Sequence, residues 1–338
     1  MKTFTMMKQK GNHIFHAIVG KRETTIIMVI AIISLAISLR TSRFLIAENL
    51  RDIFINMSIL VVVAIGQMMV ISTAGIDLSL ASTIGLSAMT VGLIISRNPF
   101  MAPLLTLPLG ILIGLILGSF NGLLISRASV PPIIATLSTM GIYRGLILIV
   151  SNGKWVNTQE LPKDFIAMTR DSFLHIPNLV WIALLVAFLA YLFIGNTRSG
   201  RAIFALGGNP TAAIMVGIRS RQILLMVYMI SGALAGLAGS LWVSRQAAAW
   251  NDTALGYELN TVAACVLGGV NIMGGSGSVP GVLLGALLLG IVTNSLLLIN
   301  ISPFWQQAVY GALILISIII NALISGRIQH ALLLRREK

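Results

Sequence analysis

The titratable side chains of the sequence offer little scope for chemistry. Asp77 is the only acidic residue in the apolar middle of the N-terminal half. An acid at that depth in a membrane marks a functional site by default, but a carboxylate just before a helix can also accept the free N–H groups of its first turn. Of these two interpretations we favour the helix cap. The histidines all lie in tails or predicted loops, so the sequence predicts no metal cluster and no proton relay: His13, His16, His175 and His330.

Two further motifs could bind charged groups. Arg144 follows Tyr143 near the end of an apolar run, and its guanidinium either reaches the lipid headgroups or faces a water-filled path with the tyrosine; both interpretations stay open. The glycine-rich stretch 275–281 loosely resembles a phosphate-binding loop, but the complete motif with its lysine occurs nowhere in the chain. We therefore expect no catalytic site, and neither nucleotide nor any other cofactor on this chain.

The composition predicts a polytopic membrane protein. Of 338 residues, 57% are hydrophobic and only 10% are charged, and several apolar runs reach the roughly 20 residues that a membrane-spanning helix needs. Continuous rather than alternating hydrophobicity excludes a β-barrel, so the predicted fold class is all-α. The single cysteine, Cys265, lies in an apolar run and is expected to pack inertly. We predict about ten transmembrane helices, at residues 24–40, 52–72, 78–96, 104–126, 132–150, 178–195, 223–243, 259–273, 279–299 and 304–324.

The distribution of charge predicts the orientation of these helices. A net charge of +13 could suggest nucleic-acid binding, but no basic surface interleaved with aromatic residues is visible, so none is expected. If the N-terminus lies inside, the inside segments hold most of the Lys and Arg, and the outside segments hold most of the Asp and Glu. Because cytoplasmic loops are rich in Lys and Arg, both termini are predicted to be cytoplasmic. The chain then divides into an N-terminal tail (1–23), a membrane domain (24–325) and a C-terminal tail (326–338).

The most informative stretch is 196–222, which we call the elbow. It lies between two long apolar blocks and contains arginines but no acidic residue. Two short apolar runs, 202–206 and 211–218, flank Gly207-Gly208-Asn209-Pro210, and the Asn-Pro pair indicates a turn followed by a helix start. We predict two short helices that are too short to span a membrane and that lie on the cytoplasmic side. An ordered cytoplasmic elbow of this kind requires a partner. The four arginines of the elbow are Arg198, Arg201, Arg219 and Arg221.

Small residues at four-residue spacing predict close helix packing, either within the chain or between two chains. They recur in three of the predicted spans, at Gly110, Gly114, Gly118 and Gly122, at Gly232 and Gly236, and at Gly281 and Gly285.

Two segments interrupt apolar runs in similar ways. Ser72–Ser82 lies between the second and third predicted spans, and Gly268–Gly277 lies between the eighth and ninth. They suggest a weak internal repeat of broken helices, which is typical of transporters, or simply two tight cytoplasmic turns.

The sequence motifs taken together resemble one family. Those that carry the resemblance are 75–79 (GIDLS), 121–122 (NG), 130–141 (VPPIIATLSTMG), 143–145 (YRG), 200–210 (GRAIFALGGNP), 263–269 (AACVLGG) and 274–277 (GGSG). In this order they resemble the membrane permease subunits of bacterial ABC importers for monosaccharides, a group that takes ribose, xylose, arabinose, rhamnose or autoinducer-2. The resemblance covers residues 50–325. Ala74 and Ala81 are mild departures from it.

The resemblance implies a multi-pass protein of the bacterial inner membrane that makes no chemical bond itself. Its partners would be a second permease chain, identical or homologous, an ABC ATPase subunit that carries ATP and Mg²⁺, a periplasmic sugar-binding protein, and membrane lipid. The elbow would couple to the ATPase, with Phe204 as the candidate anchor in the interface, and Gly207-Gly208 would let the chain turn sharply. The residues implied in coupling are Gly200, Arg201, Phe204, Ala205, Gly207, Gly208, Asn209, Ala212, Ala213 and Gly217. A pathway or structural role is implied for Asp77, Asn121, Tyr143, Arg144, Gly274 and Gly275.

Gly153-Lys154-Trp155 after Tyr143-Arg144-Gly145 favours the rhamnose or autoinducer-2 branch of this family.

Two other functions are the alternatives to an ABC permease. An ion-coupled secondary transporter would need titratable or ion-coordinating residues within the membrane, and a membrane scaffold or enzyme that does not transport would show a catalytic cluster at one face.

Overall fold

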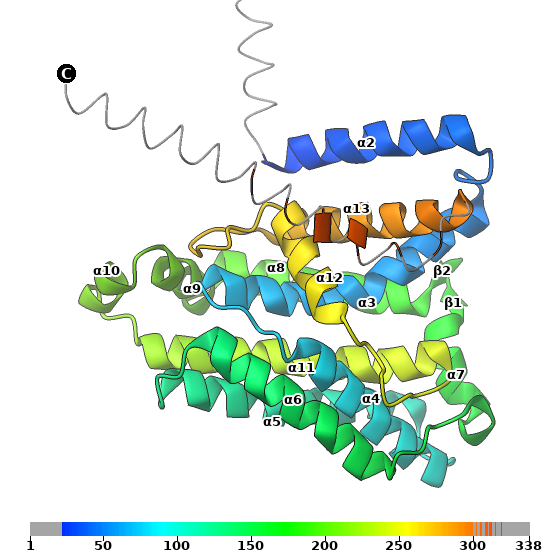
Figure 1. Ribbon diagram of the computed structural model, residues 1–338, viewed down its shortest axis with the longest axis horizontal. Helices are drawn as coiled ribbons and strands as arrows, with labels where there is room; N and C mark the ends of the chain where they lie inside the picture. Colours follow the sequence, from blue (N-terminus) through cyan, green and yellow to red (C-terminus); the bar gives the residue numbers. More distant parts are fainter. Residues whose placement is uncertain are drawn as a thin grey trace, which may run out of the picture.

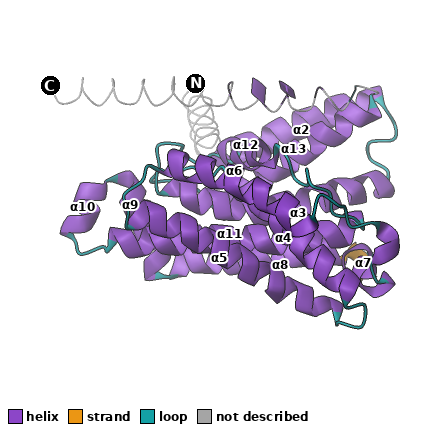
Figure 2. Ribbon diagram, turned by 60° about the horizontal axis from the view of Figure 1, so that its bottom comes forward, coloured by secondary structure: helices purple, strands orange, loops and turns teal. Residues whose placement is uncertain are grey.

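The computed structural model describes residues 22–299 and a few single residues between 302 and 319. Helices dominate this part of the chain, and its two short strands form one hairpin beside α7 (Figure 2). The elements are α2 (Arg22–Arg40), α3 (Ala47–Ser72), α4 (Leu80–Arg97), η1 (Pro103–Leu105), α5 (Thr106–Ser126), α6 (Pro132–Ser151), η2 (Thr158–Glu160), α7 (Lys163–Arg170), β1 (Ser172–Phe173), β2 (Ile176–Pro177), α8 (Asn178–Asn196), α9 (Arg198–Gly208), α10 (Pro210–Met215), α11 (Ser220–Gln246), α12 (Tyr257–Leu267) and α13 (Val279–Leu298).

Eight helices in the described part of the chain are long and apolar enough to cross a membrane, and they coincide with eight of the ten predicted spans. The all-α polytopic fold is therefore confirmed. The predicted span 259–273 is wrong, because α12 has 11 residues, which is only about 16 Å of helix. The chain leaves the helix at Gly268, and Gly269 follows with a left-handed φ of 82°. The tenth predicted span and both tails lie outside the described residues, apart from single positions.

The long helices pack around α3 and α11. In Figure 1, α11 runs through the middle of the molecule, with α5 and α4 on one side and α3 on the other. Every residue of α3 from Ser58 to Ser72 is buried, because this helix is apolar on all sides. In contrast, α8 buries only a narrow stripe that includes Ala183 and Ala187, and it exposes large apolar side chains such as Phe188 and Leu189.

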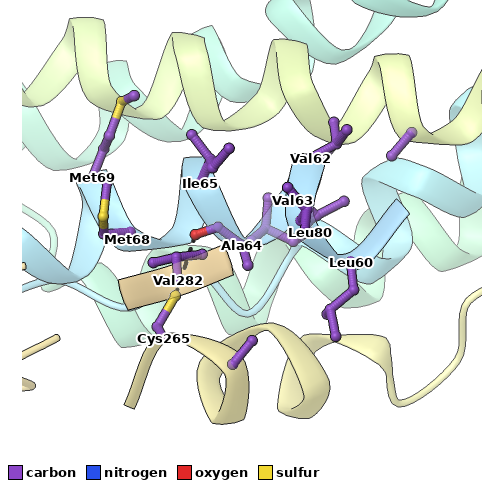
Figure 3. Packing of buried hydrophobic residues seen from close by; sticks show 14 of the residues in the cluster. Leu60, Val62, Val63, Ala64, Ile65, Met68, Met69, Leu80, Cys265 and Val282 are labelled. Atoms are coloured by element: carbon purple, nitrogen blue, oxygen red, sulfur yellow. Dashed lines mark hydrogen bonds between the residues drawn. The ribbon is translucent and has the colours of Figure 1, made fainter. Parts of the chain in front are cut away.

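The interior of the bundle is an apolar cluster that joins α3 to α12 and α13. Figure 3 shows Ala64 and Ile65 of α3 beside Val282 of α13 and Cys265 of α12. The Cys265 thiol is buried and donates a hydrogen bond to the carbonyl oxygen of Ala64 at 3.2 Å. The prediction that this cysteine packs inertly agrees with that environment.

Glycines allow the closest helix pair, α5 and α11, to approach backbone to backbone. A Cβ atom on Gly114 would overlap the carbonyl oxygen of Gly232 and lie 2.7 Å from Cα of Gly236, and a Cβ atom on Gly232 would lie 2.7 Å from Cα of Gly118. The stripe in α13 meets α12 in the same way, since a Cβ atom on Gly285 would lie 2.7 Å from the backbone nitrogen of Gly268. The small-residue stripes therefore serve packing within the chain.

Two long loops, 151–177 and 244–257, bind to each other at one end of the bundle. We call this pair of loops the cap. Val156 and Ala249 exchange backbone hydrogen bonds of 3.0 Å, and the Asn251 side chain donates to the carbonyl oxygen of Gly153 at 3.0 Å. Below them, the Ser244 hydroxyl donates to the carbonyl oxygen of Phe165 in α7 at 2.6 Å. This end of the molecule is thus ordered by contacts between segments far apart in the sequence.

The contact between α5 and α11 leads to the first prediction. Gly114→Ala should lower the free energy of unfolding by about 2 kcal/mol or more, because the two backbones must separate to make room for the methyl group. The matched control is Gly141→Ala in α6, where a Cβ atom would meet nothing within 4 Å. The control should be neutral or slightly stabilising, because alanine favours helix more than glycine does. Unfolding by sodium dodecyl sulfate titration measures both variants, and equal midpoints for the two would contradict the packing role.

Candidate functional site

The elbow folds as two short helices, as the sequence predicts, and it projects from one end of the bundle (Figure 1). Each helix begins with a side-chain cap. The Thr197 hydroxyl accepts the N–H of Gly200 at 2.9 Å, and the Asn209 side-chain oxygen accepts the N–H of Ala212 at 3.0 Å. Pro210 occupies the first position of α10, where its missing N–H is of no consequence. The capping residues therefore set where both helices start.

The expectation that Gly207 and Gly208 form the sharp turn is wrong. Both lie in the last turn of α9, and the chain changes direction at Asn209, whose φ and ψ of −154° and 96° are extended. Gly207 instead permits a close backbone contact. A Cβ atom there would overlap the carbonyl oxygen of Ser72 and lie 2.8 Å from the backbone nitrogen of Gly275, whereas a Cβ atom on Gly208 would lie 3.7 Å from its nearest neighbour.

This contact belongs to a junction of three backbone segments, which we call the glycine junction: Gly207-Gly208 of α9, Ser72–Ala74 at the end of α3, and Gly274-Gly275 before α13. The Gly275 N–H donates to the carbonyl oxygen of Ser72 at 3.0 Å. Gly274 and Gly275 have φ of 87° and 77°, a conformation that suits glycine. The two interrupted segments that resemble each other in sequence, 72–82 and 268–277, therefore contact each other. They do so at the end of the elbow helix α9.

The exposed side chains of the elbow are apolar at its tip. Ile214, Met215 and Val216 are 60%, 81% and 77% exposed, on a part of the chain that lies beyond the ends of the spans. Phe204, the anchor that the resemblance implied, is only partly exposed, and Ala213 is buried. The coupling residues implied by the resemblance did not include residues 214–216. The available signal was three consecutive apolar residues at the end of a six-residue helix, which is too short to bury them.

A basic groove of about 680 Å³ lies beside this apolar tip. It opens between the end of α5, α10 and the start of α11, and Arg127, Arg219 and Arg221 line it together with Ile214. A groove lined with arginines beside exposed apolar side chains suits a protein partner that presents both an acidic and an apolar surface.

Asp77 and Asn121, two of the predicted pathway or structural residues, are joined through Ser79. The Asp77 carboxylate accepts both the N–H of Ser79 at 3.0 Å and its hydroxyl at 2.6 Å, and the Asn121 amide donates to the Ser79 hydroxyl oxygen at 2.8 Å. All three side chains are buried. Because Ser79 is the N-cap residue directly before α4, the Asp77 carboxylate holds the entry to that helix from two residues ahead of the cap position.

Tyr143 and Arg144 have different surroundings. The Tyr143 hydroxyl donates to the carbonyl oxygen of Leu117 in α5 at 2.8 Å, and the ring is buried. The Arg144 guanidinium donates to the carbonyl oxygen of Thr253 at 2.8 Å, which ties α6 to the cap. The six predicted pathway or structural residues thus form no single site: two hold the start of α4, two belong to the glycine junction, Tyr143 bonds to α5, and Arg144 bonds to the cap. Within the described residues, no three His, Cys, Asp or Glu side chains come together as a metal site.

Comparisons with known proteins place the chain in a family. Residues 49–318 match a family model described as "Branched-chain amino acid transport system / permease component". Two relatives are named "Autoinducer 2 import system permease protein LsrC". The one from Salmonella typhi is 33% identical over 321 residues, covering 94% of this chain and 90% of the relative. The one from Yersinia pseudotuberculosis serotype O:1b is 32% identical over 312 residues, covering 92% and 87%. No solved structure matches the chain significantly.

The family model covers most of the chain and the relatives cover nearly all of it, so the predicted resemblance to importer permeases is confirmed. The eight apolar helices agree with that assignment. The chain therefore belongs to this family of transport-system permease components, and it is a non-catalytic, multi-pass transport subunit of the bacterial inner membrane.

Proposed function

We propose that this permease carries autoinducer 2, or a closely related sugar-like solute, into the cell in an ATP-driven importer. The names of the relatives support this substrate, and they agree with the branch that Gly153-Lys154-Trp155 favours. The observation that carries the proposed mechanism is the glycine junction, where the end of the elbow meets both interrupted segments of the membrane domain.

The elbow is the surface that receives the ATPase subunit. Its tip presents Ile214, Met215 and Val216 to the aqueous phase, where no lipid covers them, and a patch of this kind marks a protein interface. The neighbouring arginines would form ion pairs with acidic side chains of the ATPase: Arg127, Arg219 and Arg221. ATP and Mg²⁺ belong to that partner, and a second permease chain and a periplasmic binding protein complete the importer.

Movement passes from the elbow to the pathway through the glycine junction. A shift of α9 presses directly on the carbonyl oxygen of Ser72, which ends α3, and on Gly275, which leads into α13. Backbone contacts without intervening side chains transmit a displacement with little loss, because flexible side chains cannot absorb it. The ATPase thereby opens and closes the pathway in alternating access, with the elbow as the moving part.

An ion-coupled transporter is the second candidate, and Asp77 is the single observation that favours it, as a buried acid between two spans. Its carboxylate is already engaged by the N–H and hydroxyl of Ser79, which suits a structural role better than ion exchange.

The function is tested with the complete complex in proteoliposomes, with labelled autoinducer 2 and the binding protein added to the outside. Uptake should require ATP on the elbow side and should continue when an ionophore collapses the ion gradients, because ATP is the only energy source. Leucine and rhamnose should compete poorly. Uptake that survives ATP removal but stops with the ionophore would establish the ion-coupled candidate instead.

The glycine junction is tested by a pair of neighbouring substitutions. Gly207→Ala should lower ATP-driven uptake about tenfold while the ATPase stays bound, because the added methyl group forces α9 away from Ser72 and Gly275. Gly208→Ala adds the same methyl group with its nearest neighbour at 3.7 Å, so uptake should stay close to that of the unmodified protein. Equal uptake in the two variants would rule out transmission through this contact.

The docking surface is tested by charge substitution at the tip of the elbow. Met215→Asp should reduce capture of the ATPase from detergent extracts by about tenfold or more, because a carboxylate would be buried without a partner in the interface. Leu255→Asp is the matched control, since Leu255 is 69% exposed but belongs to the loop before α12 and not to the elbow. Capture of the ATPase by the Met215→Asp variant at the control level would place the interface elsewhere.

A further inference from the structure

A groove of about 570 Å³ lies between α3, α8 and α13, at the end of the spans opposite the elbow. It lies at that end because Val180 and Leu184 come from the start of α8, whereas the elbow follows the end of α8. The wall is almost entirely apolar and includes Met57 and Val61 of α3 and Leu283 of α13. The charged and titratable side chains lie only at the rim.

The rim carries a cation and an anion one helical turn apart. Glu48 and Arg51 are three residues apart in the first turns of α3, both are exposed, and both line the groove. His175 approaches from the β1–β2 hairpin and completes the rim. The charged rim and the apolar wall match the two parts of a phospholipid, because the rim suits its headgroup and the wall suits its acyl chains.

The hairpin holds this rim in position. Phe173 pairs with Ile176, so Leu174 and His175 form a two-residue connection, and both have positive φ, of 52° and 64°. Hairpin turns of this geometry normally use Asn or Gly, so two larger side chains here adopt an uncommon backbone conformation. The Arg51 guanidinium donates to the Ser172 hydroxyl at 3.0 Å and thereby ties the hairpin to α3.

The groove opens sideways onto the lipid-facing surface. Phe54 and Leu184 on its walls are 43% and 46% exposed, and the neighbouring outer face of α8 carries Leu185, Phe188 and Leu189, each more than half exposed. An apolar wall that continues into this surface is accessible to acyl chains from the bilayer, whereas a polar solute would find few hydrogen-bonding partners within it.

We propose that this groove is a binding site for one phospholipid with a zwitterionic amine headgroup, as in phosphatidylethanolamine. The phosphate binds Arg51 and faces His175, the ammonium group binds Glu48, and an acyl chain fills the groove between α3 and α8. The paired charges favour a zwitterionic headgroup over an anionic one, because an anionic lipid has the same phosphate but offers Glu48 no ammonium group. The bound lipid fills the space between α3 and its neighbours and so stabilises the helix that ends at the glycine junction. This site does not depend on which solute is transported.

The experiment is native mass spectrometry of the full-length protein, released from mild detergent after stepwise removal of lipid. The probes are phosphatidylethanolamine and phosphatidylglycerol with identical acyl chains. The unmodified protein should retain one phosphatidylethanolamine per chain after other lipid is lost. Leu184→Trp fills the groove and should lower retention about tenfold, whereas Leu185→Trp, on the same helix but outside the groove, should retain it.

A second pair of variants tests the headgroup contacts and does not depend on the folding of the tryptophan variant. Arg51→Gln should weaken retention about tenfold, the effect expected for one charge-assisted hydrogen bond. Arg43→Gln is the control, because it removes an exposed arginine that does not line the groove, and it should retain the lipid. Three results would each overturn the site: equal retention by Leu184→Trp and Leu185→Trp, equal retention of the two lipids, or cross-linking of Leu184→Cys to a second copy across the groove.

Discussion

The contact of Gly207 with the carbonyl oxygen of Ser72 is the constraint on which the rest of the arrangement depends. It leaves no room for a side chain, so the end of α9 cannot move towards the end of α3 without displacing it. The hydrogen bond from Gly275 to the same carbonyl oxygen brings the lead into α13 to that point. One peptide carbonyl thus connects the elbow to two parts of the membrane domain.

The same principle, contact through backbone rather than side chains, organises the bundle. Gly114 and Gly232 allow α5 and α11 to touch along their backbones, and Gly285 does the same for α13 against α12. In a membrane, apolar side chains gain nothing by leaving lipid, so close packing has to supply the energy of helix association. The helices that meet through glycine form a stiff unit, whereas α8 keeps large apolar side chains exposed on its outer face.

Several polar contacts lie where the helices are interrupted, although others, such as the hydrogen bond from Tyr143 to Leu117, join uninterrupted helices. Asp77, Ser79 and Asn121 hold the entry to α4, and Arg144 holds the cap through Thr253. These groups satisfy backbone and side-chain polar atoms that lipid could not satisfy, which explains polar residues in a chain that otherwise avoids charge. Their roles in the described structure are positional. The permease itself needs no reactive group if the ATPase partner proposed above supplies the work of transport.

Hydrophobic run length alone determined the all-α class and eight of the spans, because a helix that crosses lipid must be apolar over its whole length. Local capping chemistry at Thr197 and Asn209-Pro210 determined the two elbow helices. Only the tertiary structure revealed the close backbone contact that Gly207 makes, since glycine in a sequence does not distinguish a turn from such a contact. The same holds for α12, because the helix in the predicted span 259–273 stops at Gly268. It also holds for the exposed tip at 214–216 and for the groove beside Leu184, because burial depends on neighbours that lie far away in the chain.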